Sequence, residues 1–327
     1  MGIALRLDQG GDMTTPRFQT QIGIRRITAE GGETIRTVSE DVQIVERSMD
    51  GLCSLSELAS VHAERCIYCA SSDQLSSEHV VPYAWGGTVQ IHSGSCENCR
   101  LVTSQFENFA LNDGAMAHVR KALELPSRSK HSSVRRPLAM SLTGKGRHTL
   151  ALAEDVITPV ILGFPLFVRP GALSGDGTRL ALHLEGIAAA AFGADIASFL
   201  TGHSAAGATQ REDSKRVMAF ARAIAKIAYG WAWRDGVAQK LAGTESLVNA
   251  FMNCPEQLGA HVGTKPPPYE RYVGCQLRIE YKLAMPSQLV YLEVQLFADT
   301  GAPTYEVVLG RVDSMRAWRQ LRQSFCR

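Results

Sequence analysis

Two C-x-x-C pairs constrain the fold of this chain more than any other feature. The pairs are Cys66/Cys69, in the segment CIYC, and Cys96/Cys99, in the segment CENC. Four thiolates in two such pairs can surround one tetrahedral Zn²⁺ and leave it no open coordination position. The pairs therefore predict a structural zinc site that joins two distant turns and contributes folding free energy directly.

The segment between the two pairs carries residues suited to a different kind of chemistry. It contains EHVVP, residues 78–82, followed by Gly86-Gly87. The segment is longer than a simple zinc ribbon needs, so we expect secondary structure within it. A carboxylate beside a histidine suits a hard divalent metal and a general base. The zinc would thus hold the frame, with the chemistry beside it.

This combination resembles the HNH endonuclease family of the four-cysteine, ββα-metal kind. The resemblance rests on EHVVP between the two pairs, the Gly-Gly and the following CENCRLVTSQFE, within residues 64–130. It extends to LPSR at 125–128 and to FARAIAKIAYG at 220–230. It implies two strands followed by a helix.

The local patterns place these elements. We expect a strand over 77–82, a turn at Gly86-Gly87, a second strand near 88–92 and a helix over 101–123. Upstream, SLSE at 54–57 is a capping-box pattern and predicts a helix that ends near Arg65.

The resemblance also implies roles for individual residues. His79 would activate the water that attacks the phosphodiester, which requires a neutral imidazole oriented through its other nitrogen. Glu78 would bind a catalytic Mg²⁺ or Mn²⁺. Many HNH proteins supply a second metal ligand as Asn or His directly after the last cysteine. That position is Arg100 here, and a guanidinium cannot bind a cation.

Other residues can replace that missing ligand. Glu107 is favoured over Ser104 and Asn98, because it lies two helical turns beyond Cys99; a solvent-facing glutamate is the alternative. His92 is expected to orient His79 or contact phosphate. Arg100 itself is suited to a substrate phosphate at the start of the helix.

Basic residues gather after the motif, although the whole chain carries a net charge of only +2. A local basic stretch is where phosphate contacts are expected, and the alternative is a solvated linker. The candidates for phosphate contact are Arg120, Lys121, Arg128, Lys130, Arg135 and Arg136.

The second half of the chain has regular hydrophobic patterns. Apolar residues at helical spacing predict a helix over 213–234, ended by Gly236. Residues 275–283 alternate between apolar and polar, and 289–297 and 304–312 are further strand candidates. We expect an antiparallel meander with one face covered by the long helix, and hence an α+β fold.

These patterns divide the chain into an N-terminal extension (1–52), the HNH ββα-metal domain (53–130), a basic linker (131–146) and a larger C-terminal α+β domain (147–327). The other four cysteines are scattered along the chain, which fits a reducing cytoplasm; they are Cys53, Cys254, Cys275 and Cys326. A run of apolar residues long enough to span a membrane is lacking, so no membrane partner is expected.

The resemblance implies a metal-dependent HNH endonuclease that cleaves DNA, in phage defence or DNA processing. One alternative is a zinc-containing protein that binds nucleic acid without cutting it. Another is a nuclease that acts on RNA or on single strands. The C-terminal domain is a candidate regulator, specificity module or homodimer interface.

Overall fold

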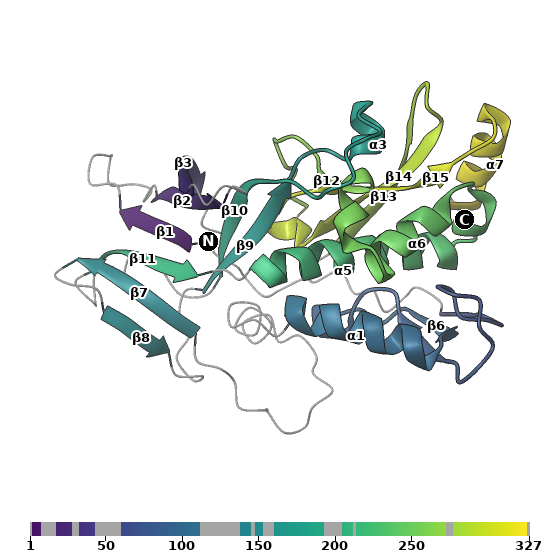
Figure 1. Ribbon diagram of the computed structural model, residues 1–327, viewed down its shortest axis with the longest axis horizontal. Coiled ribbons are helices and arrows are strands. Elements are labelled where there is room, and N and C mark those ends of the chain that lie inside the picture. Colours follow the sequence, from purple (N-terminus) through teal and green to yellow (C-terminus); the bar gives the residue numbers. More distant parts are fainter. Residues whose placement is uncertain are drawn as a thin grey trace. The chain divides into compact units, whose positions relative to one another are not determined.

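The computed structural model shows an α+β protein built from several small sheets and helices (Figure 1). The chain divides into two compact units, each assembled from separate segments. Unit 1 comprises 1–50, 111–166 and 185–217, and unit 2 comprises 51–110, 167–184 and 218–327. The structure describes residues 2–7, 18–27, 33–42, 60–111, 138–144, 148–152, 160–192, 205–211, 214–272 and 277–325.

Unit 1 is dominated by an antiparallel sheet with the strand order β3-β2-β1-β11-β7-β8. Strands β9 (Val160–Phe167) and β10 (Leu184–Phe192) form a separate pair, and their ends continue into unit 2. The bounds of the sheet strands are β1 Gly2–Leu7, β2 Phe18–Ile27, β3 Glu33–Val42, β7 Leu138–Gly144, β8 His148–Leu152 and β11 Ala205–Arg211.

The core of unit 2 is a four-stranded antiparallel sheet, in the order β12-β15-β14-β13. Strands β13, β14 and β15 pair with one another in chain order, which confirms the expected meander. Val290, Leu292 and Val294 share one face of β14 and are completely buried, because alternate strand residues face the same side of a sheet. Glu293 and Gln295 on the other face are also buried, so both sides of this strand are covered. The bounds are β12 Val262–Thr264, β13 Leu277–Ala284, β14 Leu289–Leu296 and β15 Tyr305–Arg311.

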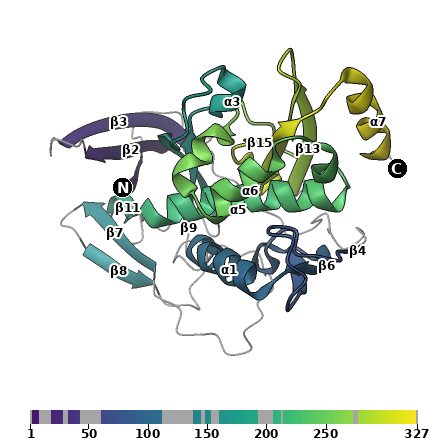
Figure 2. The ribbon, with the colours of Figure 1, turned by 45° about the vertical axis from the view of Figure 1, so that its right-hand side comes forward.

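Helix α5 (Ser214–Arg234) confirms the long helix expected from the sequence. It ends just before Gly236, which has φ +69° and donates its N–H to the carbonyl of Trp233. Within unit 2, α5 lies between the four-stranded sheet and α1 (Glu97–Leu111), as Figures 1 and 2 show. The shorter helices are α3 Gly171–Ser174, α6 Thr244–Met252 and α7 Met315–Phe325, with 3₁₀ turns at Ala238–Lys240, Pro255–Ala260 and Ala298–Thr300.

The cysteine-bearing segment forms a small sheet followed by a helix. Strand β5 (Ser76–His79) pairs antiparallel with β6 (Gln90–Ser95), and α1 follows directly. The strand–strand–helix order matches the expectation, while the bounds shift. Strand β5 ends before Pro82, and α1 begins at Glu97 because the second C-x-x-C pair itself forms the first helical turn: Arg100 donates its N–H to the carbonyl of Cys96.

The helix expected to end near Arg65 is wrong where the structure describes it. Residues Val61–His62 form strand β4, which lies parallel to β6. The N–H of Ala63 also bonds to the carbonyl of His92, so pairing with β6 outweighs the local helix signal. The expected boundary at 130 and the first part of the basic linker, 131–137, lie outside the described residues. The rest of the predicted linker, 131–146, includes strand β7 (Leu138–Gly144).

Candidate metal centre and its neighbours

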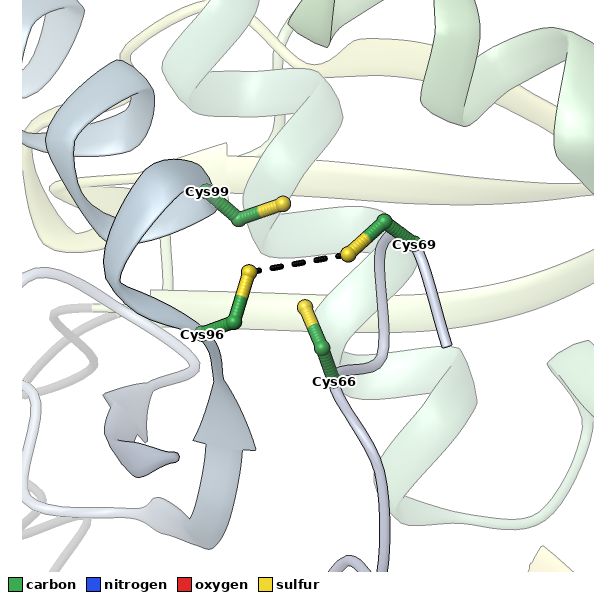
Figure 3. A group of neighbouring side chains, drawn as sticks. All are labelled: Cys66, Cys69, Cys96 and Cys99. Carbon is green, nitrogen blue, oxygen red and sulfur yellow. Dashed lines mark hydrogen bonds between the residues drawn. The ribbon is translucent and has the colours of Figure 1, made fainter. Parts of the chain in front are cut away.

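The four paired cysteines come together at one point. Their Sγ atoms lie within 4.8 Å of one another, and the sulfurs of Cys69 and Cys96 are 3.5 Å apart. Figure 3 shows all four side chains converging, two from the turn before β5 and two from the start of α1. A tetrahedral Zn²⁺ with Zn–S bonds of about 2.3 Å places its sulfurs about 3.8 Å apart. The donor set and spacing therefore fit a structural zinc ion.

Backbone hydrogen bonds shape the first cysteine turn. Cys66 donates its N–H to the carbonyl of Ser71, and its own carbonyl accepts from Ala70, which has φ +58°. The N–H of Ile67 bonds to the carbonyl of Gly94 and so ties this turn to β6. Hydrogen bonds within the turn and to β6 thus hold the backbone that carries Cys66 and Cys69.

The surroundings act in different directions on the thiols. Although Cys96 is buried, hydrogen bonds from the Cys99 backbone and from neighbouring thiols lower the pKa of its thiol. Burial raises the pKa of the Cys99 thiol, and the nearby Cys66 sulfur raises it further. Burial likewise raises the pKa of Cys69. A bound Zn²⁺ reverses this direction, because metal coordination stabilises the thiolate.

The two residues of the EHVVP segment with predicted chemistry lie on opposite faces of β5. Glu78 points into the protein and is buried, whereas His79 is half-buried, opposite Gln90 of β6. The ring of His79 packs edge-on against Tyr83, with centroids 5.7 Å apart. The structure therefore separates the candidate base from the candidate metal ligand by the plane of the sheet.

Lys226, from the middle of α5, reaches the buried side of β5. Its Nζ lies 2.6 Å from a carboxylate oxygen of Glu78 and 2.7 Å from one of Glu107. The same ammonium donates a hydrogen bond to the backbone carbonyl of His79. The structure thus brings Glu78 and Glu107 to one cation, as expected of metal ligands, but the cation is a lysine side chain.

Electrostatics favour the charged form of this lysine. Burial lowers the pKa of Lys226, while Glu107 and Glu78 raise it by more, and the net direction is upward. Sequence reasoning missed this residue. The available signal was a pair of cations, Arg222 and Lys226, four residues apart in a stretch otherwise rich in alanine and isoleucine.

With Lys226 in this position, Glu78 and Glu107 do not fit a divalent ion held between them. Mg²⁺ requires oxygen ligands at about 2.0–2.1 Å, and the ammonium already fills the space between the two carboxylates. The four cysteines are the one group of metal-ligating side chains recognised among the described residues.

The remaining predicted site residues lie apart from this cluster. The Nδ1 of His92 is 3.2 Å from the hydroxyl of Ser77, two residues before His79 on β5. Arg100 is exposed and forms a two-pronged ion pair with Glu97, with N–O distances of 2.8 and 2.6 Å. The predicted phosphate contacts Arg120, Lys121, Arg128, Lys130, Arg135 and Arg136 all lie outside the described residues.

Comparison with known proteins identifies no relative. No protein-family model, no curated protein and no solved structure matches the chain. Within the described part of the chain, no helix has the length and apolar character needed to cross a membrane.

Proposed function

We propose that this protein is an HNH-type endonuclease that hydrolyses phosphodiester bonds in DNA, with His79 as the general base. The observation that carries the proposal is the antiparallel pair β5–β6 followed by α1, with the four cysteines converging and His79 at the end of β5. The imidazole there is half-buried, and the packing of its ring on Tyr83 limits its orientation, as a general base requires.

The metal dependence expected of such an enzyme is open to direct measurement. The cation predicted for Glu78 and Glu107 has no space between them while Lys226 is in place. Plasmid cleavage with Mg²⁺, with Mn²⁺ and with a chelator added after zinc loading decides whether a divalent ion is needed.

The role of His79 is tested by His79→Ala. A general base typically contributes 10²- to 10⁴-fold, so we expect plasmid cleavage to slow by about 100-fold or more, with DNA affinity and zinc content unchanged. The matched control is His62→Ala, an exposed histidine on strand β4 of the same small sheet. Equal activity of the two variants and wild type would refute the assignment.

A second candidate function is nucleic-acid binding without cleavage. It is favoured by the ion pairs that Lys226 forms with both predicted metal ligands, Glu78 and Glu107. In this case wild type binds labelled DNA, RNA or single strands and cuts none of them.

The basic stretch after the motif is tested separately. If Arg128 and Lys130 contact phosphates, replacing both with alanine lowers the slope of log affinity against log salt concentration by roughly two, and weakens binding to all sequences equally. An unchanged slope points to a solvated linker.

Three statements about the whole protein stay predictions. They are a role in phage defence or DNA processing, a cytoplasmic location, and a homodimer formed through the C-terminal part of the chain.

A further inference from the structure

Three elements of unit 2 converge on the ammonium of Lys226. Glu78 comes from β5, Glu107 from the third turn of α1, and Lys226 from the middle of α5. The lysine side chain is 1% exposed, and the two glutamate side chains are 8% and 20% exposed. We infer that Lys226 is the resident cation of this site: it excludes divalent metals from Glu78 and Glu107 and positions the strand that carries His79.

Three oxygen atoms lie close to the ammonium of Lys226. A lysine ammonium has three N–H donors and no acceptor. Three acceptors surround Lys226: one oxygen each from Glu78 and Glu107, and the backbone carbonyl of His79. The side chain is enclosed by the protein and does not reach a substrate, so Lys226 acts as a positioning residue.

Charge balance makes lysine and a divalent ion mutually exclusive at this pair. Two carboxylates and one ammonium leave one negative charge in a largely buried place. Adding Mg²⁺ or Mn²⁺ beside the ammonium would bring two further positive charges within a few ångströms of it, where water screens poorly. Lys226 also has little freedom to leave, because its side chain is enclosed and its backbone lies mid-helix.

The bond to the His79 carbonyl extends the influence of Lys226 to the candidate base. It ties the end of β5 to α5, a helix 147 residues later in the sequence. Strand β5 is only four residues long, so this anchor supplements a short ladder of sheet hydrogen bonds. This part of the inference rests on the proposed function, whereas the exclusion of divalent ions does not.

Titration of the full-length, zinc-loaded protein with Mn²⁺, monitored by electron paramagnetic resonance, tests whether Lys226 excludes divalent ions from Glu78 and Glu107. Wild type and Glu107→Gln should give the same binding curve, because the glutamate pair takes no Mn²⁺ while Lys226 is present. Lys226→Met, which keeps an unbranched side chain but removes the charge, should gain one Mn²⁺ site at least tenfold tighter than any in wild type. Lys226→Met/Glu107→Gln should lose that site again.

Two results would overturn the exclusion. One is a wild-type Mn²⁺ site that Glu107→Gln abolishes. The other is a folded Lys226→Met protein, checked by zinc content and circular dichroism, that gains no site. If Lys226→Met does not fold, the comparison of wild type with Glu107→Gln decides the question alone.

The positioning role is tested in the cleavage assay with Lys226→Met/Glu107→Gln, which removes one charge of each sign. The kcat of this double variant should fall at least tenfold at unchanged KM. The single variant Lys226→Arg, which keeps the positive charge, should have a kcat between those of the double variant and wild type. An unchanged kcat in the folded double variant would refute positioning. A wild-type protein that cleaves nothing would instead refute the proposed function, and the Mn²⁺ result would still stand.

Discussion

At the scale of single residues, the turn between β5 and β6 depends on two glycines for different reasons. Gly86 has φ +84°, a conformation that residues with a Cβ rarely adopt. At Gly87 the constraint is space: a Cβ there would lie 2.0 Å from the carbonyl oxygen of Val81. This turn connects the strand that carries His79 to its partner, β6.

Gly87→Ala should therefore lower the free energy of unfolding by about 1–3 kcal/mol, because the backbone around Val81 must move to admit the methyl group. Gly177→Ala is the matched control, since a Cβ there meets nothing within 4 Å. It should change stability by less than about 0.5 kcal/mol. Urea unfolding of both variants measures the difference, and equal stabilities would contradict the close approach.

Residue patterns predicted the parts of this site that depend on spacing along the chain. The cysteine cluster follows from two C-x-x-C pairs, and the glycine turn follows from Gly86-Gly87. Glu107 was expected beside Glu78, and both do reach one cation. That the cation is Lys226 depends on how α5 packs against the motif, and no local pattern encodes the packing of segments so far apart.

At the scale of elements, α5 presents a polar stripe to the cysteine-bearing segment. Arg222, Lys226 and Tyr229 recur at helical spacing of four and three, so they share one face. The guanidinium of Arg222 lies over the ring of Phe106 in α1, and the hydroxyl of Tyr229 donates to the carbonyl of Ile67. Apolar periodicity predicted the helix well, because the opposite face packs on the sheet, with Phe220 against Tyr305.

Tyr229→Phe should destabilise the protein by about 1–3 kcal/mol, because it leaves the buried carbonyl of Ile67 without this donor. The neighbouring Tyr68 supplies the control. Its buried hydroxyl has no hydrogen-bond partner among the described residues, and its ring lies 6.0 Å from that of Tyr229. Tyr68→Phe should be neutral or slightly stabilising. Thermal unfolding compares the two, and the reverse order would refute the hydrogen-bond assignment.

At the scale of the whole molecule, unit 2 combines the cysteine-bearing segment with residues from the far end of the chain. Both cysteine pairs lie in this unit, and Tyr229 bonds to the residue after Cys66. Loss of the metal should therefore reach beyond the segment that binds it.

Purified protein should contain about one zinc per chain, and Cys96→Ser should reduce that content strongly, because metal binding and local folding are coupled. Hydrogen exchange should then quicken in residues 60–111 and also around Tyr229 in α5. Cys254→Ser is the control, since Cys254 lies outside the cluster. A folded wild-type protein without zinc, or unchanged exchange in Cys96→Ser, would contradict the site.

The bond from Lys226 to His79 also constrains how the gene segment that encodes the cysteine pairs can be exchanged between genes. A gene fragment that ended near residue 130 would encode two acidic side chains without their counter-charge and a cysteine turn without the helix that supports it. Exchange of this segment between genes would therefore succeed only when the recipient encodes a matching helix. In descendants of one ancestor, positions 78, 107 and 226 should change in concert, so that loss of the lysine accompanies loss of a glutamate.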